Sequence, residues 1–403
     1  MDHQLVHHVP NPIGRQRRIR DLDVRIVFER LATAGPASRA DLARTLGLAP
    51  TSVGRLVDDL RTAGLVVEGA RVAAGVGRPQ TMIQVRADAA LVAGVSVRSR
   101  FLRVHLADLD GREVARAHVE RDDTSPARLA RQLARVVGEL VDGHARGAPL
   151  AAVVIGISGV WNARDRRVYA APNLRLLEGT DALGAFLAAL GDRVLGNSVA
   201  IDNDVNLALI GEHAQGAARG IDDVFYLSLG SGVGGAAMVA GVVQRGALGF
   251  AGEIGYLPVQ VDGRPATLEG LMGREPLERY AREAGLSLGG GDVLAMLDGD
   301  GVDAEPLTDY VGRVLGQALA AVVTTLDPCL IVLGGGVGRF GSAWTARIRH
   351  HLSRIVPRTP EIVSTALGRE ASLLGAIVAA RSMARRVLVS RAVARSYRPE
   401  VTR

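Results

Sequence analysis

Apolar residues at helical spacing predict three short helices near the start of the chain. The first covers residues 21–34 and ends at Gly35 and Pro36. The second follows Ser38, which precedes Asp41 by three residues as in a shortened capping box, and Gly47 makes the next turn. The third covers residues 50–63, with a proline at its first position, where the missing N–H costs nothing.

The outward face of the third helix is small, polar and basic. Its inward positions are Val53, Leu56, Val57 and Leu60. Residues 65–67 and 81–85 predict two strands of a wing around residues 69–79. This pattern is typical of a winged helix whose third helix enters a DNA major groove. The candidate DNA-binding residues are Arg39, Thr51, Ser52, Gly54 and Arg55 on the helices, and Arg71 and Arg78 on the wing. A winged helix used only for protein contacts is the alternative.

From residue 87 onward, apolar strands alternate with amphipathic helices. Strands are expected at residues 91–98, 101–106, 114–119, 150–157, 199–204, 224–229, 235–240 and 330–333, and helices at 125–145, 205–215, 307–326 and 371–380. The fold class is therefore α/β.

A glycine-rich turn, Gly230-Ser231-Gly232-Val233-Gly234-Gly235, joins two of these strands. Because a strand and not a helix follows, the turn does not indicate a dinucleotide site. The chain contains no lysine, which excludes a P-loop. Glu253 and Tyr256 follow in GEIGY and place a carboxylate beside a ring with a polar tip, which suggests a small polyol site. A glycine-rich hairpin with no ligand is the alternative.

The segments LSLGSGVGG and RGALGFAGEIGY resemble the ROK family of repressors, open reading frames and sugar kinases. RADLARTLGLAPTSVGRLVDDLRTAGLV, followed by GRP, is similar to the winged helix-turn-helix of ROK repressors. The resemblance covers nearly the whole chain. It implies an N-terminal winged helix-turn-helix followed by a two-lobed actin-like ATPase or sugar kinase domain with a ribonuclease H-like core.

The resemblance also implies a set of sugar-binding residues. The family motifs match at Gly159, Asn173, Asn203, Asp204, Glu253, Tyr256 and Glu269. In the kinases, the position of Asp204 is the general base that takes the sugar hydroxyl proton, and the neighbouring Asn binds another hydroxyl. Without the family, Asp204 would be read as a helix N-cap and Pro172-Asn173 as a turn.

Two departures from the family pattern argue against catalysis and against zinc. Where the kinases carry an acidic Gly-Gly-Thr phosphate loop, this chain has Ser96, Val97, Arg98 and Ser99, so the metal-binding carboxylate is missing. Tyr256 replaces the zinc-binding histidine, and the following loop has no cysteine. We therefore expect no catalytic residue, no cofactor and no metal.

Composition agrees with a DNA-binding protein of more than one domain. Residues 15–86 hold 13 arginines against 7 acidic residues, a surplus of six that equals the surplus of the whole chain, 48 against 42. No apolar run indicates a membrane span or a signal peptide, so we expect a cytoplasmic protein. Cys329, the only cysteine, excludes an intrachain disulfide and is expected to be buried.

The sequence thus predicts a sugar- or sugar-phosphate-responsive transcriptional regulator, most simply a repressor. Its expected partners are double-stranded DNA with an inverted-repeat operator, a sugar effector, and further copies of itself in a dimer or tetramer. The expected domains are an extension at 1–20, a winged helix at 21–86, a sugar-binding and oligomerisation domain at 87–385, and a basic tail at 386–403. The alternatives are a sugar kinase with an added DNA-binding module and a ligand-independent regulator with a vestigial pocket.

Overall fold

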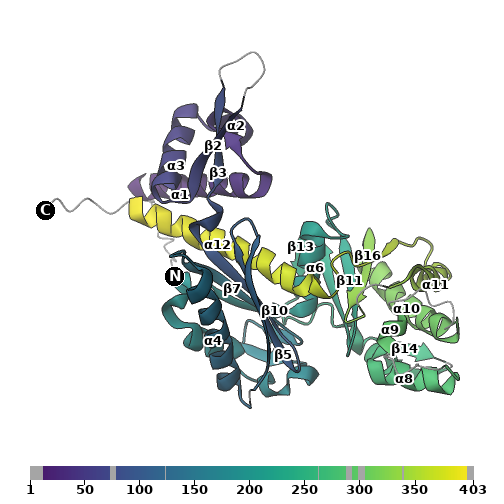
Figure 1. Ribbon diagram of the computed structural model, residues 1–403. Helices are drawn as coiled ribbons and strands as arrows, with labels where there is room; N and C mark the ends of the chain where they lie inside the picture. Colours follow the sequence, from purple (N-terminus) through teal and green to yellow (C-terminus); the bar gives the residue numbers. More distant parts are fainter. Residues whose placement is uncertain are drawn as a thin grey trace, which may run out of the picture.

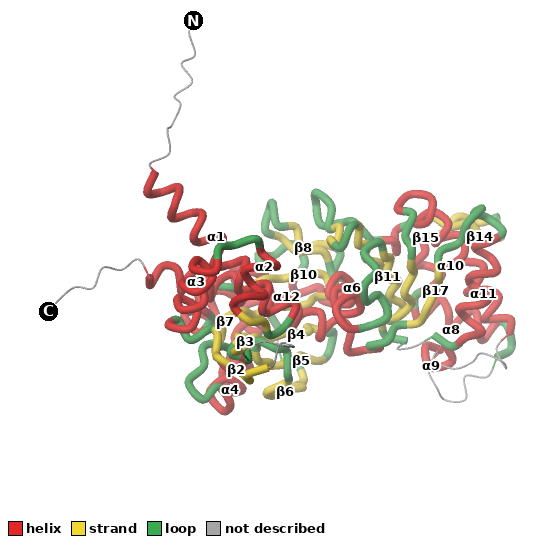
Figure 2. The backbone as a smooth tube through the Cα atoms, turned by 90° about the horizontal axis from the view of Figure 1, so that it is seen from above, coloured by secondary structure: helices red, strands yellow, loops and turns green. Residues whose placement is uncertain are grey.

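The computed structural model describes residues 12–72, 79–122, 124–261, 263–286, 293–297, 305–337 and 340–396. Three parts follow one another in space (Figure 1): a small helical domain with a wing, and two lobes that each contain a sheet. Viewed from above, the small domain lies at one end, α8 (Arg274–Glu283) and α11 (Ser342–Ser353) at the other, and α6 (Asp204–Gln215) between them (Figure 2).

The small domain is a winged helix. It consists of α1 (Pro12–Ala34), β1 (Ala37–Ser38), α2 (Arg39–Leu46), α3 (Pro50–Thr62), β2 (Val66–Val72) and β3 (Gln80–Val85). The hydroxyl of Ser38 accepts a hydrogen bond from the Asp41 N–H, as its spacing predicts, and Gly47 ends α2 at φ 64°. No side chain caps α3, because Ala49 occupies the N-cap position. The predicted wing is confirmed, with β3 between β1 and β2.

The first lobe holds β4 (Leu91–Val97), β5 (Phe101–Asp108), β6 (Glu113–Glu120), β7 (Leu150–Ile157) and β10 (Val199–Asn203). Their order in the sheet is β10-β7-β4-β5-β6, antiparallel from β4 to β6 and parallel from β4 to β10. Helices α4 (Pro126–His144) and α5 (Ala182–Leu190) pack against it. The hairpin β8 (Val160–Asn162) and β9 (Arg167–Tyr169) follows β7.

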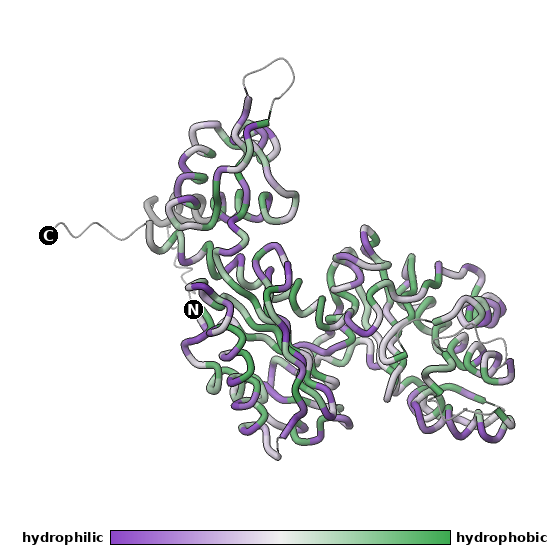
Figure 3. Tube along the Cα trace, viewed as in Figure 1, coloured by the Kyte–Doolittle hydropathy of each residue, from purple (hydrophilic) through white to green (hydrophobic). Residues whose placement is uncertain are grey.

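The second lobe repeats this order. Its sheet runs β13-β12-β11-β16-β17, with an antiparallel half and a parallel half placed as in the first lobe. The strands are β11 (Val224–Leu229), β12 (Val233–Val239), β13 (Val242–Gln244), β16 (Leu330–Gly335) and β17 (Glu361–Ser364). Helices α7 (Leu268–Met272), α9 (Val293–Leu297) and α10 (Glu305–Leu326) share its core. Apolar residues follow the strands of both sheets (Figure 3).

Two expectations about local structure are wrong. The first helix begins at Pro12, nine residues before residue 21, because its Arg-rich opening favours helix without showing an apolar period. Cys329 is exposed, since it lies just before the buried strand β16. The cysteine-free segment after Tyr256 forms a hairpin, in which β14 (Pro258–Val261) pairs with β15 (Arg264–Thr267), and Val259 and Leu268 are buried.

The largest difference concerns the last helix. The sequence predicts a helix over residues 371–380, but α12 runs from Ala371 to Ser396. Its second half reaches the winged helix (Figure 1), where Ala384, Leu388 and Val389 share one apolar core with Val24 and Val27 of α1. Arg385 forms an ion pair of 2.9 Å with Glu29 of α1. Residues 386–396 of the expected tail are therefore the end of a packed helix between the first lobe and the winged helix, and the rest of that tail lies outside the described residues.

Candidate functional site

Asn203 and Asp204 lie where β10 ends and α6 begins. The side-chain oxygen of Asn203 caps α6 by accepting a hydrogen bond of 2.7 Å from the Val205 N–H. Its amide nitrogen donates to Glu253 at 3.0 Å, which links the first lobe to the GEIGY segment. Asp204 is the first residue of α6 and is 9% exposed. The structure thus places both matched residues against one of the matched carboxylates.

Two neighbouring carboxylates influence the ionisation of Glu253 at this point. Burial, with Asp204 and Glu269 as further negative neighbours, raises the pKa of Glu253 to about 7. Burial also raises the pKa of Glu269, whose carboxylate accepts a hydrogen bond of 2.6 Å from the Val233 N–H of the glycine-rich turn. Asp204, Glu253 and Glu269 therefore come together from three separate segments, and their oxygens can accept hydrogen bonds from sugar hydroxyls.

Arg98 provides the positive charge of the site. Its guanidinium Nη1 lies 3.1 Å from Oδ2 of Asp204, and its side chain is half exposed. Burial raises the pKa of Asp204 even though this cation opposes the shift. Arg98 follows β4 and belongs to the tight hairpin to β5, in which its N–H donates to Phe101 at 2.9 Å. The segment at the position of the kinases' phosphate loop is thus a regular hairpin that pairs its own arginine with Asp204.

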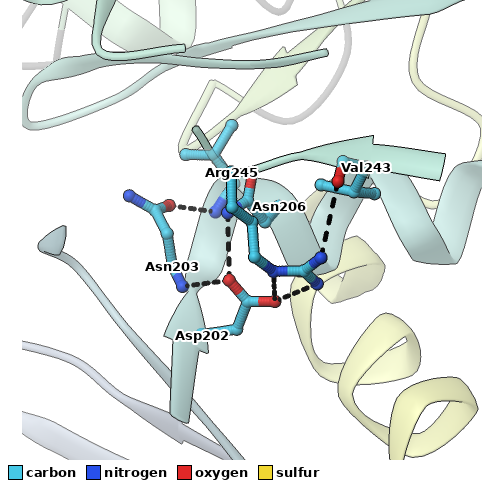
Figure 4. Close-up of polar contacts among 6 residues, drawn as sticks. Asp202, Asn203, Asn206, Val243 and Arg245 are labelled. Carbon is cyan, nitrogen blue, oxygen red and sulfur yellow. Dashed lines mark hydrogen bonds and ion pairs between the residues drawn. The ribbon is translucent and has the colours of Figure 1, made fainter. Parts of the chain in front are cut away.

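Asp202 and Arg245 join the two lobes beside this site, and sequence reasoning missed both (Figure 4). Arg245 donates to Oδ2 of Asp202 through Nε at 3.0 Å and through Nη2 at 2.6 Å. Oδ1 of Asp202 accepts from the Asn203 N–H and from Nδ2 of Asn206, each at 2.9 Å. The available signal was an acidic residue directly before Asn203 and an arginine at the start of RGALGF.

Of the other predicted ligand-binding residues, Asn173 contacts the glycine-rich turn. Nδ2 of Asn173 donates to the Ser231 hydroxyl at 3.3 Å. Gly159 has φ 154°, and a Cβ there would lie 2.8 Å from the Cβ of Ala171, so the close approach requires glycine. Tyr256 is 60% exposed, and its ring centroid lies 6.0 Å from that of Phe250. Its ring is therefore largely in contact with solvent.

Metal binding has no support in the described ranges. No group of three or more His, Cys, Asp or Glu side chains there is placed to hold an ion. No helix among the described residues is long and apolar enough to cross a membrane.

The winged helix presents the predicted outward residues of α3 to solvent. Thr51, Ser52 and Arg55 are exposed, and a Cβ on Gly54 would meet nothing within 4 Å. Arg71 on β2 is exposed as well, whereas Arg78 lies outside the described residues. Arg39 lies 3.5 Å from Asp58 of α3 and 3.3 Å from Glu68 of β2. Arg39 thus ties α2 to the third helix and the wing, which is a different role from a free phosphate contact.

Comparison with known proteins agrees with this architecture. The model of the ROK family matches residues 92–383. The chain is 30% identical over 203 residues to a glucokinase of Halalkalibacterium halodurans, a match that covers 44% of this chain and 62% of that protein, less than two thirds of its length. It is 22% identical over 378 residues to the xylose repressor of Bacillus spizizenii, covering 90% of this chain and 96% of the repressor.

Among solved structures, a ROK family transcriptional regulator described as a homologue of the Escherichia coli MLC protein superposes with a TM-score of 0.76. The match covers 94% of this chain and 99% of that one at 18% identity, so it supports the fold alone. Three observations lead to one conclusion. The two lobes repeat one sheet order, Asn203, Asp204 and Glu253 lie together, and the family model matches most of the chain. The chain belongs to the ROK family.

Proposed function

We propose that this protein is a DNA-binding transcriptional regulator, a repressor in its simplest form, whose kinase-like domain binds a sugar without phosphorylating it. The relative that covers most of the chain is named a xylose repressor, and the structural neighbour is a ROK transcriptional regulator. Because a glucokinase also matches, the choice between sensor and kinase depends on the site itself.

The Arg98–Asp204 pair is the observation that carries the proposal. A general base must accept the proton of the sugar hydroxyl, and the transferred phosphate needs a metal and backbone donors beside it. Here a guanidinium lies 3.1 Å from the carboxylate, and the preceding Ser96 is 2% exposed within β4. A hairpin that supplies its own cation and no metal-binding carboxylate suits ligand recognition better than phosphoryl transfer.

The exposed face of α3 suits DNA. Thr51, Ser52 and Arg55 lie near the N-terminal end of α3 and are exposed, so they can reach base edges and phosphates in a major groove. One winged helix buries a modest surface, so we propose a dimer or tetramer on an inverted-repeat operator.

Helix α12 supplies a physical link between ligand and DNA. Its first turn lies beside Asp204 in the cleft between the lobes, and its last turns pack on the winged helix. Its 26 residues span roughly 39 Å at the standard rise of a helix. It also crosses α6, the helix that begins with Asp204, at a contact so close that a Cβ on Gly375 would lie 1.7 Å from the Leu207 carbonyl oxygen. A ligand that moves Asp204 and α6 would therefore displace α12 and the winged helix together.

The proposal predicts that the protein releases no ADP when ATP, magnesium and a panel of hexoses and pentoses are supplied together. A ROK glucokinase assayed in parallel is the positive control. Sugar-dependent ADP release that disappears in Asp204→Asn would contradict the proposal, because that substitution removes the carboxylate at the position of the kinases' general base.

A further inference from the structure

A cavity of about 390 Å³ lies where the winged helix, the first lobe and the last turns of α12 meet. Helix α12 passes between the other two parts there (Figure 1). The winged helix contributes Gly64 and Leu65, the first lobe contributes Pro149 and Leu195, and α12 contributes Leu388. Small-molecule pockets range from roughly 300 to 1,000 Å³ and often lie between domains. The cavity is therefore large enough for a small organic molecule, and none of its lining residues belongs to the candidate sugar site.

The apolar part of the lining is already packed. Leu65 and Leu388 are 4% and 7% exposed and belong to the core that the winged helix shares with α12. Ala89, Leu195 and Ala392 are partly buried and pack against the same core. Because these side chains are ordered before a ligand arrives, binding there costs little further conformational entropy.

Arginines give the cavity a positive charge. Arg86 and Arg391 line it, and none of the described lining residues is acidic. Nε of Arg86 donates to the exposed Asp88 at 2.9 Å, which leaves its two terminal nitrogens able to donate. Arg391 is exposed, as is Arg146, which directly precedes the lining residue Gly147. In the part of the chain that the structure describes, no carboxylate pairs with either of these two arginines, so the positive charge is not neutralised.

The guanidinium of Arg86 is held against one wall of the cavity. The backbone N–H of Arg86 donates to the Leu65 carbonyl oxygen at 2.9 Å. Nη1 of Arg86 lies beside Gly64, since a Cβ added there would be 3.5 Å from it. Gly64 and Leu65 both line the cavity just after α3. The cation is thus fixed where the winged helix joins the first lobe.

We propose that this cavity binds a small organic anion, a carboxylate or a phosphate ester with an apolar body, as a second effector besides the sugar. The anionic group pairs with Arg86 and Arg391, and the apolar body packs on Leu65, Leu195 and Leu388. A neutral polyol would instead place its hydroxyls against an apolar lining that cannot bond them. Because the walls come from three parts of the molecule, the bound anion fixes the winged helix relative to the first lobe.

Calorimetric titration of the full-length protein with phenyl phosphate, benzoate, inorganic phosphate and benzyl alcohol tests the binding. We expect at least one of the two aromatic anions to bind at one site per chain. Inorganic phosphate lacks the apolar body and benzyl alcohol lacks the charge, so each should bind at least about tenfold more weakly, as expected for loss of a charge-assisted contact or of a buried ring. The comparison of phenyl phosphate with benzoate distinguishes a phosphate from a carboxylate ligand. Failure of both aromatic anions to bind would overturn the inference.

Three variants separate the cavity from the rest of the basic surface. Arg391→Ala should weaken the aromatic anion about tenfold, as loss of one charged hydrogen-bonding partner does. Ala392→Phe keeps both lining arginines and fills the cavity, so it should abolish binding. Arg386→Ala is the matched control, because Arg386 is exposed on the same helix and does not line the cavity. Equal affinity in the wild type, Arg391→Ala and Ala392→Phe would show that the anion binds elsewhere.

DNA affinity tests whether the anion is an effector. On a duplex that the full-length protein selects from a random pool, a saturating aromatic anion should change the affinity of the wild type about fivefold, the scale of a typical allosteric coupling. It should leave the affinity of Ala392→Phe unchanged. An unchanged affinity in the wild type would contradict the effector role. The proposed response to sugar is tested separately, because Ala392→Phe should retain it and Asp204→Ala should retain the response to the anion.

Discussion

Glu253 is the residue of the site whose ionisation can be measured most directly. It accepts a hydrogen bond from Asn203, and Asp204 and Glu269 lie close enough to disfavour its charge. Its carboxyl therefore holds its proton to about pH 7 in the folded protein, while an unfolded glutamate releases it near pH 4.5. The neutral carboxyl can donate a hydrogen bond as well as accept one, so it can pair with a sugar hydroxyl that acts as acceptor or as donor.

This shift predicts how stability depends on pH. The folded pKa of Glu253 is raised, so its contribution to stability is complete below pH 4.5 and is lost as pH rises through 7. Glu253→Gln should remove that part of the pH dependence, on the order of 1–3 kcal/mol after allowance for partial exposure. Urea unfolding of both proteins at pH 5 and pH 8 measures it.

The control for this experiment is Glu361→Gln, which changes an exposed carboxylate on β17. Wild type and this control should lose stability alike between the two pH values. If Glu253→Gln loses as much stability between the two pH values as the wild type and the control do, burial and the neighbouring carboxylates do not govern the ionisation of Glu253.

At the scale of elements, the crossing of α6 and α12 is the contact on which the connection between site and winged helix depends. Two glycines make it possible: a Cβ on Gly211 would lie 2.5 Å from the Ala371 carbonyl oxygen, and one on Gly375 would lie 1.7 Å from that of Leu207. Both obstacles are backbone atoms, which cannot move aside as the end of a side chain can.

Gly375→Ala should therefore destabilise the protein by about 1–3 kcal/mol, the usual range for overpacking, and weaken the response of DNA binding to ligand. The sign is opposite to the ordinary gain of up to about 1 kcal/mol for Gly→Ala inside a helix. Gly143→Ala in α4 is the matched control, because a Cβ there meets nothing within 4 Å, and it should leave stability unchanged or raise it. Denaturant midpoints of the three proteins decide the matter, and equal losses for both substitutions would contradict the account.

The sequence could predict the elements whose pattern is local. The cap at Ser38, the buried positions of α3 and the hairpin around the glycine-rich turn follow from residue spacing alone, and the structure confirms them. It could not predict that α12 continues to Ser396, because Ala384, Leu388 and Val389 are buried in a core shared with the winged helix, about 300 or more residues earlier in the sequence. The sequence could not predict the Arg98–Asp204 and Asp202–Arg245 ion pairs for the same reason, because each joins segments that only the fold brings together.

At the scale of the whole molecule, the winged helix and the two lobes are connected by continuous packing and by polar contacts. The core of the winged helix is continuous with apolar side chains of α12 and of the first lobe, including Ala90 and Val92 at the start of its sheet. The lobes are joined by Asp202 and Arg245, and by Asn203 and Glu253. We therefore propose that a change in how the lobes close reaches the winged helix through packed helices and not through a flexible linker.

The most direct test of this account is the change in DNA affinity caused by ligand, measured by fluorescence anisotropy on a duplex that the full-length protein selects from a random pool. The ligand is the sugar or sugar derivative that most raises the unfolding temperature in a thermal-shift panel. We predict that it shifts the affinity of the wild type by about fivefold or more, the scale of a typical allosteric coupling. Asp204→Ala should keep the affinity for DNA measured without ligand and lose the shift. An equal shift in both proteins, or none in either while the wild type demonstrably binds ligand, would contradict the account.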